Sequence, residues 1–467
     1  MITLSNALTR LQSNFFSTVQ TLLSPAQIAA QLDGFRQRNR LYYGHRLFYP
    51  FLYQVLRHTS CQQAVLDAID AALLPPDVGK HNAAFCQARL ALPEAPLQAL
   101  CEATGRTITA GTQPVVPGRR VLVVDGTTCR LADTDANQKE YPQNGSQRAG
   151  CGSPLVYLLA MMNLSSGAVL HLTFGHKREH DSRRFTRLWP MIEAGDIVLG
   201  DKAFDAYRTL AALQERQADG LFAMHTRVFD KSQAQELGPD DYLLRIRRPA
   251  ARASDAESME RWPEELVVRV IRARWQRPGF RDIELWLITT LVDPTQYPAP
   301  FLSALYRRRW EMELRLRDIK TTMGMGHLPV KSPAMARKLV WMYLIAYNLV
   351  RAVMLDAAAQ AGCQPGRISF KVTLSRLRST AWDRGGWNRD ESAYLRLLAC
   401  LAALQLPRRD RPSEPRLLKN RPNKYKTRHR SWAKARKLLH EKQQAKQSEA
   451  RDVFQKRKYR AKCPSPA

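Results

Sequence analysis

The sequence lacks the motifs of several common protein classes. Its eight cysteines are scattered, with no Cys-x-x-Cys pair, which argues against a structural zinc site and favours free thiols in a reducing compartment. There is no P-loop, no Gly-x-Ser-x-Gly and no Gly-x-Gly-x-x-Gly that opens a helix after a strand. Serine-hydrolase chemistry, ATP use and a nucleotide cofactor are therefore without support.

Long apolar runs are also missing. The longest, residues 339–350, is followed directly by Arg351 and is shorter than the roughly 20 residues that cross a bilayer. The opening residues, MITLSNALTRLQSNFF, lack the basic region and the apolar stretch of a signal peptide. We therefore expect a cytoplasmic protein with no membrane partner.

Acidic residues are few relative to basic ones. There are 42 Asp and Glu against 72 Lys and Arg, a formal net charge of +30, which predicts a polyanionic partner, foremost nucleic acid. More than half of that excess falls in residues 407–467, which are poor in aliphatic side chains. This composition predicts a mostly disordered basic tail that binds phosphates without sequence preference. A solvated tail with no specific role is the alternative.

The length of 467 residues predicts two or three domains. Residues 1–115 read as a helical N-terminal DNA-binding region, because apolar residues recur at helical spacing and arginines alternate with aromatic residues over 36–57. An ordinary helical domain with a solvent-exposed basic face is the alternative. A second helical region, 361–406, precedes the tail.

The sequence pattern of residues 116–360 is typical of an α/β domain. Short apolar runs alternate with helical stretches, the turn at 165–167 indicates a hairpin, and a β-rich insertion is expected at about 228–291. The expected order is strands at 121–124, 155–164 and 168–174, a helix at 182–194, a strand at 197–200, a helix at 207–217 and a strand at 221–225.

Two aspartates stand where apolar strands end. Asp125 follows the run 121–124, and Asp201 follows the run 197–200. An acid just past the carboxyl end of a strand lies where α/β sheets bind ligands, and two such acids on adjacent strands can share a divalent metal. Taken singly, each aspartate also fits a helix cap or a turn.

A charged helix expected from about 302 to 322 supplies further candidate site residues. Tyr306, Glu313 and Lys320 are seven residues apart and form one stripe, which Arg309 joins from four residues before the glutamate. A carboxylate flanked by cations suits a site that holds a metal and clamps phosphates. A solvent-exposed helix with many ion pairs would show the same spacing.

These residues resemble a known signature. Tyr306-x2-Arg309-x3-Glu313-x6-Lys320 is similar, position for position, to the YREK signature of DDE transposases of the insertion-sequence-four family. The segments VVDGTT and GDKAFDAY, which contain the two aspartates, and residues 289–325 resemble the same family.

The resemblance implies an α/β fold with a ribonuclease-H-like catalytic core. Asp125, Asp201 and Glu313 would be the catalytic residues and would bind two Mg²⁺ or Mn²⁺ ions. The enzyme would bind the terminal repeats of its insertion sequence, cut there and transfer the strands to target DNA. It would work as a homodimer on double-stranded DNA, associated with a bacterial nucleoid.

The resemblance also implies DNA-binding residues. Tyr306, Arg309 and Lys320 would contact phosphates near the cleavage site. Trp286, in the last strand before the signature helix, would stack on a flipped-out base, as in hairpin-forming members of the family. A core tryptophan in a strand is the alternative for Trp286.

Three other functions remain open. The first is a DNA-binding relic without catalysis, and the second is a metal-dependent nuclease without sequence preference. The third is a zinc peptidase, because residues 176–180 fit the pattern His-x-x-Glu-His. That pattern would have to lie on a helix, whereas Gly175 before it and the helix start at Asp181-Ser182 predict a loop.

Overall fold

The computed structural model describes residues 23, 25–32, 41–70, 74–75, 81–145, 151–225, 229, 232, 234–250, 260–276, 283–380, 391–407, 441 and 444. Contacts divide the chain into two compact units. The first comprises Met1–Ala273 with Leu285–Pro407, and the second comprises Arg274–Glu284 with Arg408–Ala467. The predicted basic tail, apart from three single residues, and arginines 36, 38 and 40 lie outside the described residues.

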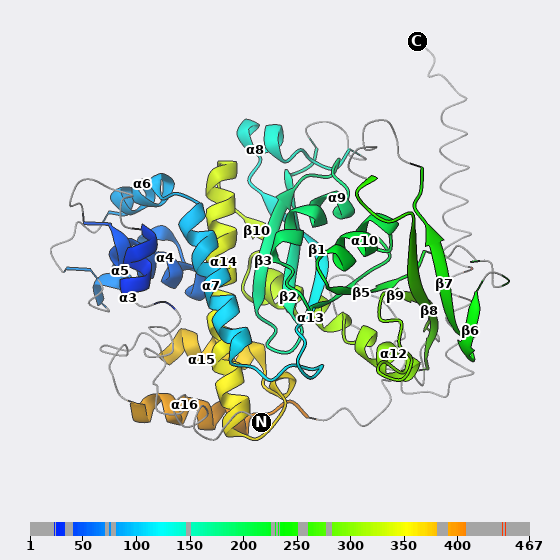
Figure 1. Cartoon of the computed structure of the whole chain (residues 1–467). Coiled ribbons are helices and arrows are strands. Elements are labelled where there is room, and N and C mark those ends of the chain that lie inside the picture. Colours follow the sequence, from blue (N-terminus) through cyan, green and yellow to red (C-terminus); the bar gives the residue numbers. More distant parts are fainter. Residues whose placement is uncertain are drawn as a thin grey trace, which may run out of the picture. The chain divides into compact units, whose positions relative to one another are not determined.

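A mixed sheet forms the centre of the first unit (Figure 1). Five of its strands lie in the order β3-β2-β1-β4-β5, with β2 antiparallel to both neighbours and β1, β4 and β5 mutually parallel. The predicted order of these strands and of the helices between them is confirmed. The bounds are β1 Val121–Leu131, β2 Leu155–Asn163, β3 Val169–Gly175, β4 Ile197–Gly200 and β5 Asp219–Ala223.

Further strands extend the sheet beyond β5 in the order β9-β8-β7-β6. Strand β9 runs antiparallel to β5, and β7 runs antiparallel to both β6 and β8. The predicted β texture of the stretch 228–291 is thus borne out by β6 Gln235–Gly238, β7 Asp241–Arg247, β8 Glu265–Trp275 and β9 Ile283–Thr289. A short strand, β10 His327–Leu328, runs parallel to the end of β1.

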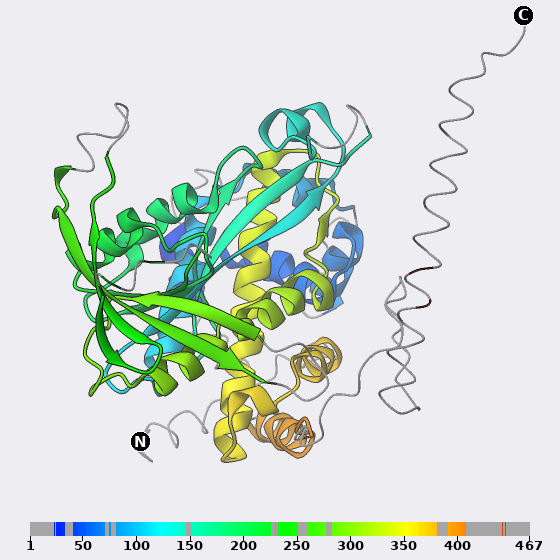
Figure 2. The ribbon, with the colours of Figure 1, turned by 90° about the vertical axis from the view of Figure 1, so that its right-hand side faces the viewer.

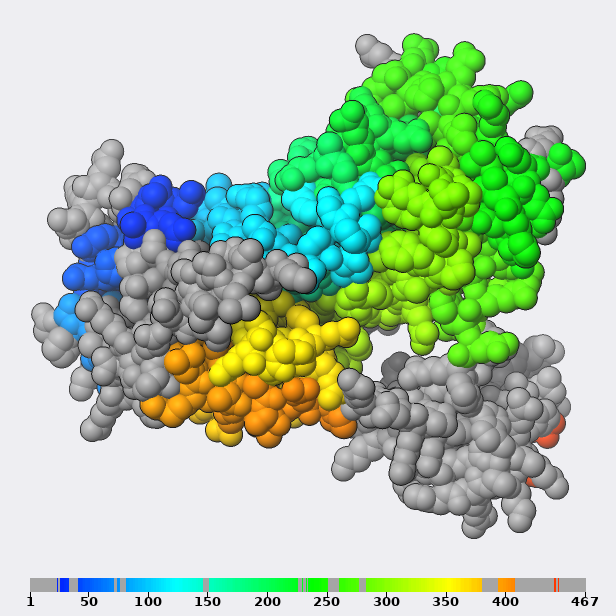
Figure 3. All heavy atoms as spheres, turned by 60° about the horizontal axis from the view of Figure 1, so that its bottom comes forward, coloured from blue at the N-terminus to red at the C-terminus, as the bar shows by residue number. Residues whose placement is uncertain are grey.

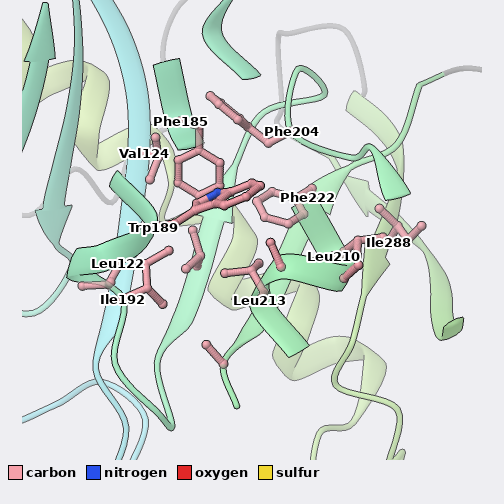
Figure 4. Packing of buried hydrophobic residues seen from close by; sticks show 14 of the residues in the cluster. Leu122, Val124, Phe185, Trp189, Ile192, Phe204, Leu210, Leu213, Phe222 and Ile288 are labelled. Carbon is pink, nitrogen blue, oxygen red and sulfur yellow. The ribbon is translucent and has the colours of Figure 1, made fainter. Parts of the chain in front are cut away.

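One face of the sheet packs on short helices. Leu122 and Val124 of β1 alternate with residues of the other face and meet Trp189, Leu213 and Phe222 in a buried cluster (Figure 4). The helix expected at 182–194 is shorter and changes to a tighter 3₁₀ turn, where a proline removes a backbone donor. The elements are α9 Asp181–Phe185, the 3₁₀ segment η1 Thr186–Met191 and α10 Tyr207–Glu215.

The long helix α14, Pro333–Gln360, packs against several helices of the first unit, among them α4, α7, α15 and α16 (Figure 2). By length and composition it could cross a membrane, but 89% of its apolar window is buried inside the protein, as in a core helix. Helix α7 packs between α14 and β3, and the orange helices α15 and α16 lie against α14 (Figure 3). Their bounds are α7 Ala95–Ala110, η4 Pro365–Arg367, α15 Phe370–Thr380 and α16 Glu391–Ala403.

The N-terminal region is helical where it is described. Ser60 accepts a hydrogen bond of 3.1 Å from the backbone N–H of Gln63 and so caps the start of α5. Helix α4 packs on α14. The bounds are α3 Pro25–Leu32, α4 Gly44–Arg57, α5 Cys61–Asp70 and α6 Ala83–Ala91, and a further short helix, α8 Asp135–Glu140, follows β1.

Side chains of α14 hold the hairpin turn between β2 and β3. The side-chain amide of Asn348 accepts from the N–H of Val169 at 2.9 Å and donates to its carbonyl at 3.0 Å. Arg351 donates to the carbonyl of Ser166 at 2.6 and 3.1 Å. Gly167 has φ +72, and a Cβ there would lie 2.8 Å from the Arg351 guanidinium, so both backbone and space require glycine.

Candidate active site

Strand pairing brings the two predicted aspartates together. Val123 of β1 is paired with Leu199 of the parallel strand β4, and Asp125 and Asp201 each stand two residues further on. They therefore occupy matching positions on neighbouring strands.

Strand β1 does not end at its aspartate, contrary to the sequence-based expectation. It continues to Leu131 because β2 keeps pairing with it, Asp125 lying opposite Ala160. On the β4 side, pairing stops at Val123 and resumes with β10 at Arg130. Residues 124–129 thus have no strand partner on that edge of β1. We call this stretch the window on β1, and Asp125 lies near its start.

The Asp125 carboxyl group is partly buried and has negatively charged neighbours. Its side chain is 20% exposed. Burial is the main cause that raises its pKa to about 6, and the carboxylates of Asp201 and Glu313 raise it further. Arg309 and the N–H of Gly126, which donates to Asp125 at 2.9 Å, oppose that rise. The other two predicted acids are therefore close enough to Asp125 to affect its ionisation.

Glu313 comes from a helix that is interrupted twice. The single helix expected at 302–322 consists of three parts, because the N–H groups of Arg308 and Arg309 bond three rather than four residues back and tighten one turn. The parts are α12 Ala299–Arg307, α13 Trp310–Arg317 and a π-helical turn, η3 Asp318–Thr322. The Glu313 side chain is 54% exposed.

Arg309 lies between two of the acids. One guanidinium nitrogen is 3.6 Å from the Asp125 carboxylate, and the other is 3.3 Å from that of Glu313. Its side chain is only 10% exposed. In this structure the arginine therefore compensates the charge of the two carboxylates and links β1 to α13.

Tyr306 is more buried than expected for a residue that contacts a DNA phosphate. Its side chain is 2% exposed, and it forms hydrogen bonds with Arg309 and with the backbone of Ala223, the last residue of β5. Burial raises the pKa of Tyr306. Contact of Tyr306 with a DNA phosphate stays a prediction and would need this residue to become accessible.

Lys320 lies near Cys129, a later residue of β1. It belongs to the π-helical turn, whose i→i+5 bond runs from the N–H of Met323 to the carbonyl of Asp318 at 2.9 Å. Burial raises the pKa of Cys129 to about 12, and the charge of Lys320 partly offsets that rise. Cys129 is four residues after Asp125 on the same face of β1, so Lys320 faces the strand that carries the first acid.

Trp286 packs among aromatic side chains of the β-rich segment. Its ring centroid is 5.2 Å from that of Phe229 and 6.2 Å from that of Tyr242, and the Arg272 guanidinium lies 5.7 Å from it. The ring is partly buried against the core. This packing suits the core alternative as well as a stacking surface, so the base-stacking role stays a prediction.

Sequence reasoning missed Asp205. Its carboxylate accepts a 2.6 Å bond from the N–H of His225, just after β5, and burial raises its pKa. Asp201 accepts from the N–H of Ala203 at 2.8 Å. The two aspartates, four residues apart, therefore hold the loop that follows β4. The second acid in GDKAFDAY was the available signal.

The His-x-x-Glu-His pattern lies in a loop, as expected. His176 accepts from the N–H of Arg178, and His180 caps α9. Glu179 pairs with Arg187 at 2.6 Å. Each of these three side chains therefore has a local partner, and the arrangement gives no support to a zinc peptidase.

The donor set suits a hard divalent cation. Carboxylate oxygens are the protein ligands that Mg²⁺ and Mn²⁺ prefer. The pKa of Asp125 is raised first by burial and then by the neighbouring carboxylates, and a bound cation would favour its ionised form. Across the described residues, no three Asp, Glu, His or Cys side chains are gathered closely enough to hold an ion as they stand. Arg309 pairs with both Asp125 and Glu313, so an ion held by those two carboxylates would compete with it.

The sheet order, with acids on β1, after β4 and on a later helix, defines the ribonuclease-H-like core that was predicted. The family model for the transposase DDE domain matches residues 116–349, and the chain belongs to this family. It is 26% identical, over 316 residues, to the transposase InsG for insertion sequence element IS4 of Escherichia coli (strain K12). That match covers 66% of this chain and 70% of InsG, and the predicted kinship with insertion-sequence-four transposases is confirmed.

Among solved structures, the chain is similar to the piggyBac transposase in a synaptic complex with hairpin DNA. The two share 10% sequence identity, the match covers 86% of each chain, and the TM-score is 0.44. A likeness of this size carries no argument about the site.

Proposed function

We propose that the chain cuts DNA strands at the ends of its own insertion sequence and transfers them to target DNA. Family membership supports DNA transposition. The observation that carries the finer proposal is the pairing of β1 with β4, which sets Asp125 and Asp201 at matching positions, together with Arg309, which contacts both Asp125 and Glu313.

In this proposal Asp125, Asp201 and Glu313 hold two divalent ions. When bound, Mg²⁺ or Mn²⁺ held by these three carboxylates would supply activation of a water or a DNA 3′-hydroxyl and stabilisation of the charge on the leaving 3′-oxygen. The partly buried side chain of Asp125 would place one ligand on a strand that β2 pairs with, whereas the more exposed side chain of Glu313 could adjust. Rigid placement of ligands favours the positioning on which phosphoryl transfer depends.

The cations of the signature would then bind the scissile DNA. Arg309 would exchange its carboxylate partners for a phosphate, and Lys320, beside β1, would hold the strand further along. Tyr306 would assist at the same phosphates, and Trp286 would receive a displaced base.

The partner in this proposal is double-stranded DNA, both at the element ends and at the target. The helical region 1–115 would bind the terminal repeats, the core 116–360 would cut, and the helical region 361–406 would pack behind it. The basic tail 407–467 would bind phosphates. Two subunits would pair the two ends, in the cytoplasm at the nucleoid.

The direct test uses purified full-length protein, Mg²⁺ and a plasmid that carries the element's own ends. Wild type should cut at those ends, whereas Asp125→Asn and Glu313→Gln should lose activity by a factor of about 10³ or more. Asp133→Asn on the surface after β1 and Glu236→Gln in β6 are matched controls and should cut normally.

Two results would favour the alternative functions. Binding of the ends without cleavage, under Mg²⁺ and Mn²⁺ alike, would indicate a DNA-binding relic. Cleavage that unrelated competitor DNA suppresses as well as the element ends do would indicate a nuclease without sequence preference.

A further inference from the structure

Two cysteines and a buried arginine meet in the N-terminal helices, away from the carboxylates. Cys61 is the first residue of α5, and Cys86 belongs to α6. Their thiols are in hydrogen-bonding contact, and both residues are partly exposed. The proposed transposition chemistry uses neither of them.

Arg89 of α6 has an unusual environment for a charged side chain. The residue is 6% exposed and lies over the rings of Phe51 and Phe85, 4.3 and 5.4 Å from their centroids. Its Nη1 donates to the sulfur of Cys61 at 2.8 Å, and its Nε has no hydrogen-bond partner. Within the described part of the chain, no carboxylate forms an ion pair with Arg89, so the Cys61 sulfur is its one hydrogen-bond acceptor.

The positive charge of Arg89 has no anionic partner among the described residues. A guanidinium that is buried without an anion is strongly unfavourable, and removal of that imbalance is a large driving force. A thiolate at Cys61 would supply the missing negative charge. Gln54 also donates to the same sulfur, at 3.3 Å. Cysteines with cationic neighbours of this kind, and partly open to solvent, are the ones that react as thiolates.

We propose that Cys61 and Cys86 form a dithiol that hydroperoxides oxidise to a disulfide. The Cys61 thiol first gives its proton to the solvent, and the thiolate attacks hydrogen peroxide. An S–O bond forms while the O–O bond breaks, and the hydroxide that leaves combines with the released proton to give water. The Cys86 thiol then attacks the sulfenic sulfur, the S–S bond forms, and the departing oxygen leaves as water with the Cys86 proton. The two sulfurs lose two electrons, which the peroxide gains.

The two cysteines have distinct parts in this reaction. Burial raises the pKa of the Cys86 thiol, which suits the second, resolving step. The product would join α5 to α6 covalently and leave the Arg89 guanidinium beside a disulfide sulfur. Oxidation would therefore alter the helical region that we propose binds DNA, but the site itself requires neither DNA nor metal.

The first test measures alkylation of each cysteine in the full-length, reduced protein at limiting iodoacetamide, by mass spectrometry. Cys61 should react about tenfold faster than Cys151, although Cys151 is exposed and Cys61 only partly so. Arg89→Gln should abolish this advantage, and Arg106→Gln, on the exposed face of α7, should preserve it. Equal rates for the two cysteines in wild type would overturn the proposal.

A second test does not depend on how the arginine variant folds. Wild type treated with stoichiometric hydrogen peroxide should give a Cys61–Cys86 disulfide in peptide maps. Cys86→Ser should instead give a dimedone adduct, the mark of a sulfenic acid, at Cys61. If the peroxide produces no such disulfide, or if the adduct forms at other cysteines only, the proposal is wrong.

Discussion

At the scale of single residues, ionisation of Asp125 works against folding. Its pKa in the folded protein is about 6, above its usual value of 3.8, so the folded state favours the protonated form. The contribution of this group to stability is therefore greatest below about pH 3.8 and declines as the pH rises towards 6.

Replacement of this carboxylate should stabilise the protein while it abolishes cleavage. Without metal at pH 7.5, Asp125→Asn should raise the free energy of unfolding by roughly 1–3 kcal/mol, and the gain should shrink below pH 6. Urea unfolding in EDTA at several pH values measures this. Asp133→Asn is the control. An unchanged or lower stability of Asp125→Asn at pH 7.5 would show that burial of the carboxylate costs little.

Arg309 competes with metal for the same carboxylates. Its guanidinium contacts Asp125 and Glu313, so Arg309→Gln should leave both carboxylates without this cation. The variant should therefore bind Mn²⁺ about tenfold more tightly, a gain of ~1.4 kcal/mol in binding free energy. Titration of Mn²⁺ by electron paramagnetic resonance measures this. Arg308→Gln, which removes a pair with Glu311, is the control. Weaker binding in Arg309→Gln would mean that the arginine organises the ligands rather than competing for them.

At the scale of elements, α14 acts as the support for the hairpin next to β1. Asn348 is fully buried and satisfies both backbone groups of Val169. Asn348→Ala should therefore leave a buried donor and acceptor unpaired and lower the free energy of unfolding by roughly 2–4 kcal/mol. Thermal and urea unfolding measure this, with Gln360→Ala, at the exposed end of α14, as control. A loss of less than about 0.5 kcal/mol would mean that water replaces the amide.

Most elements could be predicted because apolar periodicity and turn residues are local signals. The strands that carry Asp125 and Asp201 were found from such runs, and the spacing of the YREK residues located Glu313. The continuation of β1 beyond Asp125 could not be found this way. Residues 126–130 are polar and resemble a turn, and only pairing with β2 makes them a strand.

The surroundings of individual residues in the candidate site could not be predicted from the sequence either. Helical spacing put Arg309 on the same stripe as Glu313, but its burial against Asp125 depends on β1, which is remote in sequence. The contact of Asp205 with His225 depends likewise on how β4 and β5 pair. Such contacts arise from tertiary packing, which periodicity does not report.

At the scale of the whole molecule, the excess of basic residues should govern affinity for DNA. The proposed role of the tail predicts that removal of residues 408–467 weakens binding to unrelated DNA and makes it less salt-dependent, because fewer counterions are released. Fluorescence anisotropy at several salt concentrations measures this. A full-length variant with glutamine for the tail's Lys and Arg should behave like the truncation. An unchanged slope in both variants would argue for a solvated tail without a role.

The window on β1 also bears on how this protein remains separate from its copies. A strand edge with unused hydrogen-bonding groups commonly recruits strands from other molecules and leads to aggregation. Here β4 and β10 close the edge at both ends, and residues 124–129 span only roughly 20 Å. A strand from another chain would have to fit between these two stops and beside the Asp125 carboxylate. Self-association of the protein through this part of β1 is thereby restricted.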